Sequence, residues 1–279
     1  MRIPTSKLRD AARLGAAVAL ILGTSASVVH AQQSDDEWRN DCRDRQRERE
    51  TRCVVKVDRM EAGGTLRVDA GQNGGVAVYG ADRSDIEIHA RIQAWAESAG
   101  DAESLAEDVS LDYGRGSIRA DGPTTGRREG WSVSFVVYVP RQSDLDLQAH
   151  NGPVSATGVS GSIEARTQNG PLSLRSVSGQ VNARTQNGPL DVELDGTRWT
   201  GQGLDAETRN GPVHLSIPDG YNARLETGTV NGPFDTEVPL QVTLQGRQRS
   251  RRIEATLGNG GPLIRAITTN GPVVIRRRD

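Results

Sequence analysis

The segment IEARTQNGPLSL, residues 163–174, returns 18 residues later as VNARTQNGPLDV, residues 181–192. The tripeptide Asn-Gly-Pro at its centre occurs six times in the chain, and Asn-Gly-Gly-Pro at residues 259–262 is a seventh variant. Self-similarity at a short, fixed period indicates a repeat architecture in which each unit stacks on the one before it. The asparagines that open these turns are Asn151, Asn169, Asn187, Asn210, Asn231, Asn259 and Asn270.

Apolar or small side chains alternate with polar ones on both sides of each tripeptide. In the copy at Asn169, the alternating positions are Ile163, Ala165 and Thr167 before the turn and Leu172 after it. Alternation with a period of two is typical of a β-strand with one buried face. Each unit is therefore predicted to contain a strand, an Asn-Gly corner, a second strand and a further turn.

The proline after each Asn-Gly pair decides between two β architectures. Asn-Gly between two strands normally closes a two-residue hairpin, but proline has no N–H to complete it and is tolerated mainly at the first position of a strand. Asparagine and glycine can bend the chain at this point, because both adopt left-handed backbone angles more readily than other residues. The sequence therefore favours an all-β fold, a parallel β-solenoid resembling a β-helix, over an antiparallel meander. In such a stack the asparagine side chains would form an amide ladder.

Four segments are predicted along the chain. Residues 1–31 have the pattern of a signal peptide, and residues 32–54 form a charged tether. Residues 55–144 are expected to form irregular N-terminal β coils that cap the solenoid, with one short helix beginning near Asp101. Residues 145–279 are expected to form the regular Asn-Gly-Pro coils.

The first segment predicts export from the cytoplasm. Basic residues precede an apolar run from Leu14 to Gly23, and Val29-His30-Ala31 has the small residues of a cleavage site. The run is short for a bilayer span and no later segment is longer and equally apolar, so no transmembrane anchor is expected. The predicted location is the periplasm, the cell surface or the extracellular space.

Composition argues against a nucleic-acid partner. The whole chain has a formal net charge of −2, and because residues 1–31 carry +3, the remainder is near −5. Nucleic-acid binders instead present a clustered basic surface. An aromatic content of 4% and 32 glycines suit a coil built from small side chains.

The chain contains two cysteines, Cys42 and Cys53. In an oxidising compartment we expect them to form a disulfide that closes the charged segment between them. The alternative is a metal-binding or redox pair, which would call for CxxC spacing or a nearby histidine, and the sequence has neither.

The inward-facing residue six positions before each turn asparagine is followed by a residue whose side chain points outward. These outward side chains are predicted to form a row along the stack. Carboxylates one strand spacing apart, ~4.8 Å, could bind Ca²⁺ or act as the acid and base of a glycosidase. Arg166 and Arg184 on the same face favour a solvated salt-bridge surface instead. The row comprises Asp146, Glu164, Asn182, Asp205, Glu226 and Glu254. Glu164 and Glu226 are its candidates for ligand contact.

Other chemical motifs are sparse. Trp199, in a glycine-rich loop, could stack on a sugar ring or pack over the edge of a coil. Residues 201–206 match the GxGxxA nucleotide pattern by letter but lead into an alternating strand instead of a helix, so no nucleotide site is predicted. His89, His150 and His214 lack the spacing of metal ligands. No catalytic residue, metal or cofactor is predicted.

Several stretches resemble one known family. The Asn-Gly turns between alternating strands, the Val139-Pro140 boundary, residues 199–203 and Pro218-Asp219-Gly220-Tyr221 are similar to the bacterial putative-adhesin domain of unknown function, a β-strand repeat family. The resemblance covers roughly residues 55–279. It implies an exported β-solenoid and brings no catalytic residues with it.

Two functional hypotheses follow from these observations. The first is a non-enzymatic, exported β-repeat protein of the cell envelope that acts as a structural or adhesive interaction module. The second is a glycan-binding protein or a polysaccharide-active enzyme on a β-helix scaffold. The expected partner is accordingly an envelope protein or a glycan of unknown identity.

Overall fold

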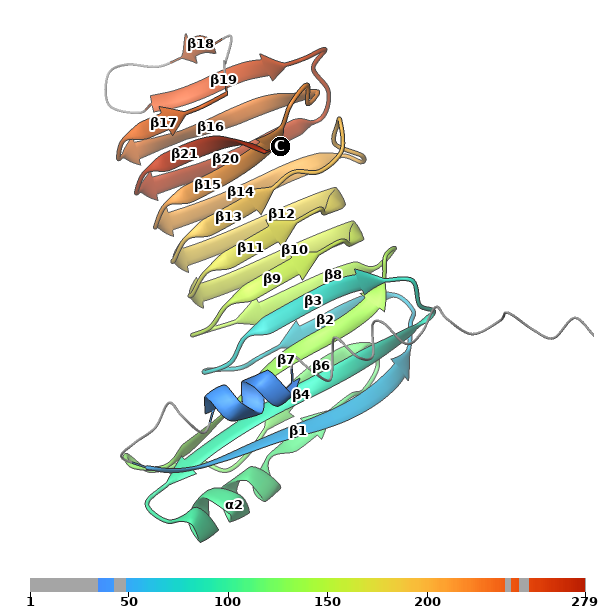
Figure 1. Cartoon of the computed structure of the whole chain (residues 1–279), viewed down its shortest axis with the longest axis vertical. Helices are drawn as coiled ribbons and strands as arrows, with labels where there is room; N and C mark the ends of the chain where they lie inside the picture. The colour runs from blue at the N-terminus through green and yellow to red at the C-terminus, as the bar shows by residue number, and fades with distance from the viewer. Residues whose placement is uncertain (1–34, 43–48, 239–241, 246–250, 279) are drawn as a thin grey trace, which may run out of the picture.

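The described part of the protein is all-β apart from two short helices. The computed structural model describes residues 35–42, 49–238, 242–245 and 251–278, so the predicted signal peptide lies outside the described residues. The strands form a ten-stranded sheet, sheet A, and an eleven-stranded sheet, sheet B. The two sheets face each other along an elongated stack of coils (Figure 1).

Each regular coil places one strand in sheet B and the next in sheet A, with an Asn-Gly-Pro corner between them. Ile163 pairs with Leu145 on one side and with Val181 on the other, both in parallel. The middle of the molecule is therefore a run of parallel coils. They are β8 (Asp144–Ala149) with β9 (Val154–Thr157), β10 (Ser160–Asn169) with β11 (Leu172–Arg175), β12 (Ser178–Asn187) with β13 (Leu190–Glu193), and β14 (Gly203–Asn210) with β15 (Val213–Pro218).

The last coil does not stack in chain order. In sheet B, β20 (Leu263–Asn270) lies between β14 and β16 (Ala223–Asn231). In sheet A, β21 (Val273–Arg278) lies between β15 and β17 (Phe234–Thr236). The chain thus leaves a space one coil wide after β15, builds the next coil beyond it, and returns to fill the space. The expectation that each unit stacks on the one before it is wrong at this end.

The strand that precedes this last coil, β19, runs antiparallel to its neighbours. β19 (Arg251–Leu257) pairs antiparallel with β16 and with β18 (Val242–Gln245). The turn at Asn259 therefore lies at the opposite end of the sheet from the Asn-Gly-Pro corners, where its backbone N–H donates to the side-chain oxygen of Asn222 at 2.8 Å. The interpretation of Asn259 as a seventh corner was wrong, because its strand runs in the reverse direction.

The N-terminal half shows the same out-of-order stacking. The coil of β2 and β3 lies between the coil of β8 and β9 and that of β6 and β7, although it precedes both in the chain. Antiparallel strands then extend both sheets, which are therefore mixed and not wholly parallel. The strands are β1 (Glu50–Glu61), β2 (Thr65–Asp69), β3 (Val76–Ala81), β4 (Asp85–Ala96), β5 (Ser110–Asp112), β6 (Ser117–Asp121) and β7 (Gly130–Pro140).

Both helices lie in the N-terminal part. Helix α2 (Ala99–Asp108) is the one expected near Asp101, but its N-cap is Ser98, whose hydroxyl accepts the N–H of Asp101 at 3.2 Å. Residues 35–42 are also helical, within the segment predicted to be a tether. Since β1 begins at Glu50, regular structure starts before the predicted boundary at residue 55.

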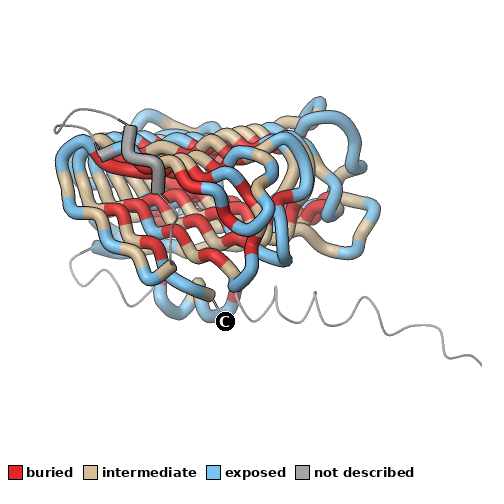
Figure 2. The backbone as a smooth tube through the Cα atoms, turned by 90° about the horizontal axis from the view of Figure 1, so that it is seen from above, coloured by how far each residue is buried: buried red, intermediate tan, exposed pale blue. Residues whose placement is uncertain are grey.

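The core is a column of small and branched side chains between the sheets. Alternate residues of each strand point inward, so that Leu145, Ile163 and Val181 stack on one another with 2% or less of their surface exposed. Viewed from above, the buried positions line the interior of the coils (Figure 2). Burial of this apolar surface, at about 25 cal/mol per Å², is the main stabilising term.

The corner explains why glycine and threonine recur beside proline. A Cβ on Gly170 would lie 2.1 Å from the carbonyl oxygen of Gly152 in the adjacent coil, so close approach requires glycine. In a parallel pair the carbonyl of Gly170 would accept the N–H of the residue after Gly188, but that residue is Pro189. The hydroxyl of Thr185 donates to this carbonyl instead, at 3.0 Å.

The same threonine bond recurs along the stack in spatial order. The hydroxyls of Thr167, Thr208, Thr268 and Thr229 donate to the carbonyls of Gly152, Gly188, Gly211 and Gly271 at 2.8–2.9 Å. Each threonine comes from one coil and each glycine from the adjacent coil. Every one of these corners therefore has a substitute for the N–H that proline removes.

The corner asparagines form a continuous amide ladder. The amide of Asn169 donates to the side-chain oxygen of Asn151 at 2.8 Å, and Asn187 donates to Asn169 at the same distance. Asn73, in the irregular half, begins the ladder by accepting from Asn151 at 3.2 Å. In spatial order its members are Asn73, Asn151, Asn169, Asn187, Asn210, Asn270 and Asn231.

Replacing Thr208 by valine tests the corner bond. Thr208 is fully buried, so Thr208→Val keeps the shape but leaves the Gly188 carbonyl without its donor. We expect the free energy of unfolding, measured by urea denaturation, to fall by about 1–3 kcal/mol. Thr208→Ser is the control, because it keeps the hydroxyl and loses one methyl group, at a cost of about 0.8 kcal/mol. A valine variant as stable as the serine variant would contradict this role.

Candidate functional site

The outer face of sheet B carries the row of polar side chains identified in the sequence. Across the strands, Glu164 lies beside Asp146 and Asn182, and Asn182 lies beside Asp205. Because β20 intervenes, Arg265 comes next to Asp205, followed by Glu226 and Glu254. The row is thus interrupted by an amide and a guanidinium and is not a continuous line of carboxylates.

Arginines pair with four carboxylates of this row, those of Asp146, Glu164, Asp205 and Glu226. Arg184 contacts Asp205 at 2.9 Å and Glu207 at 3.3 Å, and Arg265 bonds to Asp205 and reaches Glu226 at 3.5 Å. Burial disfavours the charge of Asp205, yet hydrogen bonds from Arg265 and Arg184 outweigh it and lower its pKa. A carboxyl group with a lowered pKa stays ionised and makes a poor general acid.

Glu164 and Glu226 do not form a site together. Three strands, β12, β14 and β20, separate them in sheet B, which corresponds to roughly 19 Å at the usual strand spacing. Glu164 contacts Arg166 at 2.5 Å, and Glu226 contacts Arg252 at 3.3 Å. The separation rules out a shared role as an acid and base pair, because a retaining glycosidase holds its carboxyl groups about 5–5.5 Å apart.

Trp199 is not available to a ligand. Its side chain is buried, with 4% of its surface exposed, and its indole N–H donates to the carbonyl of Gly179 at 3.0 Å. The interpretation of Trp199 as a sugar-stacking residue was wrong. The residue instead fills the inner edge of the coil where β12 begins.

A shallow cavity of about 610 Å³ lies on this same face, beside the corners. Arg166 and Arg184 occupy equivalent positions one strand apart, and Gln168 and Gln186 do the same two residues further on. Arg209 continues the glutamine row, and among the described residues it has no ion-pair partner. The groove of these five residues, here called the sheet B groove, presents guanidinium and amide groups at a repeat of ~4.8 Å.

A second polar cluster lies on the outer face of sheet A. The ring of His89, in β4, is buried between two carboxylates: its Nδ1 is 2.5 Å from Asp35 and its Nε2 is 3.0 Å from Glu87. Only the imidazolium carries an N–H on both nitrogens, so this geometry suits the protonated ring. We call Asp35, Glu87 and His89 the histidine cluster.

Arginines and aromatic rings surround the histidine cluster. Arg91 donates to Asp35 at 2.8 Å and its guanidinium lies 5.9 Å from the ring of Trp38. Arg83 and Arg59 contact Glu87 at 3.2 Å and 2.8 Å. Tyr138 of β7 packs edge-on against the His89 ring. Groups from β1, β4, β7 and the helix of residues 35–42 therefore all meet here.

Burial and pairing act in opposite directions on His89. Burial disfavours the charged ring, but hydrogen bonds to Asp35 and Glu87 outweigh it and raise the pKa of His89. The pKa values of Asp35 and Glu87 are lowered, because their bonds to His89 and to arginines outweigh the same burial. The cluster is therefore held together by charges and fastens residue 35 to β4.

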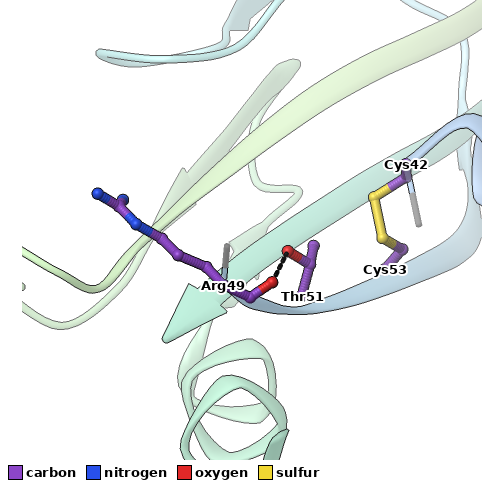
Figure 3. The surroundings of a disulfide bond; sticks show 4 residues. All are labelled: Cys42, Arg49, Thr51 and Cys53. Carbon is purple, nitrogen blue, oxygen red and sulfur yellow. Dashed lines mark hydrogen bonds between the residues drawn. A yellow bond between two sulfur atoms is a disulfide. The ribbon is translucent and has the colours of Figure 1, made fainter. Parts of the chain in front are cut away.

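A disulfide between Cys42 and Cys53 fastens the other end of the same helix to β1 (Figure 3). Figure 3 also shows the hydroxyl of Thr51 donating to the carbonyl of Arg49 at the start of this strand, at 3.5 Å. The disulfide expected from the two cysteines is present. The histidine cluster was not expected, because nothing in the local sequence indicates that Asp35 reaches His89.

Within the described part of the chain, no group of three or more histidine, cysteine or acidic residues could hold a metal ion. Among the same residues, no helix is long and apolar enough to cross a membrane.

Comparison with known proteins assigns the chain to a family. The model of the Toastrack DUF4097 family matches residues 24–276, and the protein belongs to this family. The resemblance to a putative-adhesin domain of unknown function is thereby confirmed. No curated protein matches the chain.

Solved structures that match the chain have little sequence in common with it. A putative cell adhesion protein from Clostridium sporogenes is 8% identical, with 81% of this chain and 100% of that one covered and a TM-score of 0.44. A putative adhesin from Bacteroides fragilis is 10% identical, with 81% and 97% covered and a TM-score of 0.36. A putative lipid binding protein from Parabacteroides distasonis is 6% identical, with the same coverage and a TM-score of 0.29.

The histidine cluster predicts a pH dependence of stability. Folding raises the pKa of His89, so the ring contributes to the free energy of unfolding. This contribution is fully present below about pH 6.5, the pKa in the unfolded chain, and is lost as the pH rises through the pKa in the folded protein. Folding lowers the pKa values of Asp35 and Glu87, so these carboxylates stabilise the protein above about pH 4, and this stabilisation is lost in acid. We therefore expect the contribution of the cluster to be largest between about pH 4 and 6.5.

Comparing His89→Gln with the wild type across this range measures the effect. Each tenfold difference in proton affinity between the folded and unfolded states corresponds to about 1.4 kcal/mol of unfolding free energy. We expect the difference between the two proteins to shrink as the pH rises from 6 to 9. His214→Gln is the control, because His214 is exposed and its Nδ1 is hydrogen-bonded to Asp191 at 2.7 Å. A difference that does not change with pH would contradict a charged His89.

Proposed function

We propose that the protein is exported and acts in the cell envelope as a non-enzymatic module, structural or adhesive, that binds its partner through flat, repetitive sheet faces. The observation that carries this proposal is the outer face of sheet B, where paired charges and amides repeat from coil to coil. A surface with one repeating pattern suits an extended partner. Glu164, Asp205 and Glu226 on this face are paired with arginines, which favours binding over acid–base chemistry.

The signal-like first segment and the disulfide support export. A disulfide persists in oxidising compartments outside the cytoplasm. The periplasm and the cell surface both meet this condition. Membership of a family of unknown function leaves the partner open, and we propose an envelope protein or a glycan.

The sheet B groove favours a second candidate function, the binding of a glycan. Its guanidinium groups can contact carboxylates of an acidic polysaccharide, and its amides can bond to hydroxyl groups. Arg166 and Arg184 retain about half of their surface exposed even though each is paired. This groove replaces Trp199, Glu164 and Glu226 as the proposed ligand-contacting residues.

Protease treatment of cells tests the proposed location. We expect protease to cleave the protein before lysis, either on intact cells or after osmotic permeabilisation of the envelope, because an exported chain lies outside the cytoplasmic membrane. Cleavage on intact cells would support an adhesive role, and cleavage only after permeabilisation a periplasmic structural role. A cytoplasmic protein serves as the control. Protection of this protein until full lysis would contradict export.

Binding of polygalacturonate, with dextran as the neutral control, tests the glycan hypothesis. In the double variant Arg166→Gln/Arg184→Gln we expect roughly tenfold weaker binding, because each exposed charge contact contributes up to about 1 kcal/mol. Arg175→Gln, on the outer face of sheet A, is the matched control. Equal binding by all three proteins, or no binding by the wild type, would contradict this function.

A further inference from the structure

Strand β1 forms one edge of sheet A along its entire length. All twelve of its residues pair with β4, from Glu50 opposite Ala96 to Glu61 opposite Asp85. On its other side no described strand pairs with it. Figure 1 shows β1 outside β4 at the lower end of the stack. Natural proteins usually shorten, cover or block such edges, because a row of free N–H and C=O groups can pair with another chain.

The first half of β1 is partly covered by other elements. Arg52 contacts Glu103 of α2 at 3.1 Å, and Cys53 carries the disulfide. The second half is open: residues 56–59 are exposed in four consecutive positions. The side chain of Val57 is 56% exposed, the highest value for a large hydrophobic residue in the described chain. An exposed valine on an open edge strand is typical of an interaction surface.

We propose that β1 pairs antiparallel with β1 of a second copy of this chain, across a twofold axis at Val57. A twofold axis that relates two antiparallel edge strands stands perpendicular to the sheet, so opposed residues lie on the same face. With the axis at Val57, Val57 faces its own copy. Lys56 then faces Asp58 of the second copy on one side of the axis, and Asp58 faces Lys56 on the other. Val54 faces Met60.

The sequence of β1 disfavours a twofold axis at the residues that follow or directly precede Val57. An axis at Lys56, Asp58 or Arg59 would place a charged side chain directly opposite its own copy, which is destabilising. An axis at Met60 would pair only the last three residues of the strand. The register at Val57 pairs nine residues, from Cys53 to Glu61. It opposes two valines and forms two ion pairs, and each such cross-strand pair contributes about 0.2–1 kcal/mol.

The existing contacts of these residues are compatible with this pairing. Lys56 donates one hydrogen bond to the carbonyl of Val109, at 3.3 Å, and its ammonium group has two further donors. Arg59 remains bonded to Glu87 within its own chain. The resulting dimer would join two copies of sheet A into one continuous sheet and leave the sheet B grooves free. The inference does not depend on the proposed function, although a dimer would make any adhesive face bivalent.

Charge exchange between two positions tests both the interface and its register. We expect the purified wild-type protein to sediment as a dimer in analytical ultracentrifugation. In a dimer of the Lys56→Asp variant, residues 56 and 58 of the two copies would place carboxylates opposite each other at two positions. In a dimer of the Asp58→Lys variant, ammonium groups would face each other at the same two positions. Each variant alone should therefore be a monomer. An equimolar mixture of the two variants should form a heterodimer, and the double variant Lys56→Asp/Asp58→Lys should dimerise by itself. Arg127→Asp, in an exposed loop, is the control and should remain a dimer.

Several results would overturn the proposal. A monomeric wild type would refute it, and so would single variants that remain dimers or a mixture that stays monomeric. Thermal melting of each variant shows whether it is folded. If a single variant does not fold, Val57→Glu provides a second test, because it places two carboxylates together at the axis without altering Lys56 or Asp58. A folded Val57→Glu variant that still dimerises would exclude this edge as the interface.

Discussion

The bond between the corner threonine and the glycine carbonyl of the adjacent coil is the interaction on which the repeat depends. Proline fixes the corner but removes an N–H that the parallel ladder requires, and Thr185 supplies a donor to Gly170 in its place. Glycine is needed because the coils approach too closely for a Cβ at this point. The Asn ladder then ties the same corners together from the outside. Threonine, asparagine, glycine and proline at fixed spacing thus form a corner in which the carbonyl opposite proline still has a hydrogen-bond donor.

The hydrogen bonds of the corner join only two adjacent coils, so they do not determine the order in which the coils stack. The corner after β20 lies between those of β14 and β16 and makes the same contacts as a corner stacked in chain order. There the hydroxyl of Thr268 donates to the carbonyl of Gly211, as the other corner threonines do to the glycines of their adjacent coils. Both ends of the molecule use this freedom by placing a coil out of chain order. The first and last coils of the repeat are thereby enclosed between others, so the edge strands of the two sheets are β1, β17, β18 and β5.

The irregular N-terminal half follows a different physical rule. Charges, not stacked apolar residues, hold residue 35 against sheet A, since His89 lies between two carboxylates and arginines complete the cluster. A buried charge network is costly unless every member is paired, as it is here. The outer face of sheet B uses the same pairing in a solvated setting, where it shapes a binding surface at lower energetic cost.

The sequence by itself determined the β-repeat, the alternation of inward and outward residues, the amide ladder and the disulfide, because each depends on residues at short or fixed separation. Only the tertiary structure decided the place of the last coil, the reversed direction of β19 and hence of Asn259, the burial of Trp199, and the contact of Asp35 with His89. These depend on which equivalent neighbour a strand selects, and a repeat offers several neighbours of nearly equal energy. The physical reason is that a period encodes how units fit together but not the order in which they stack.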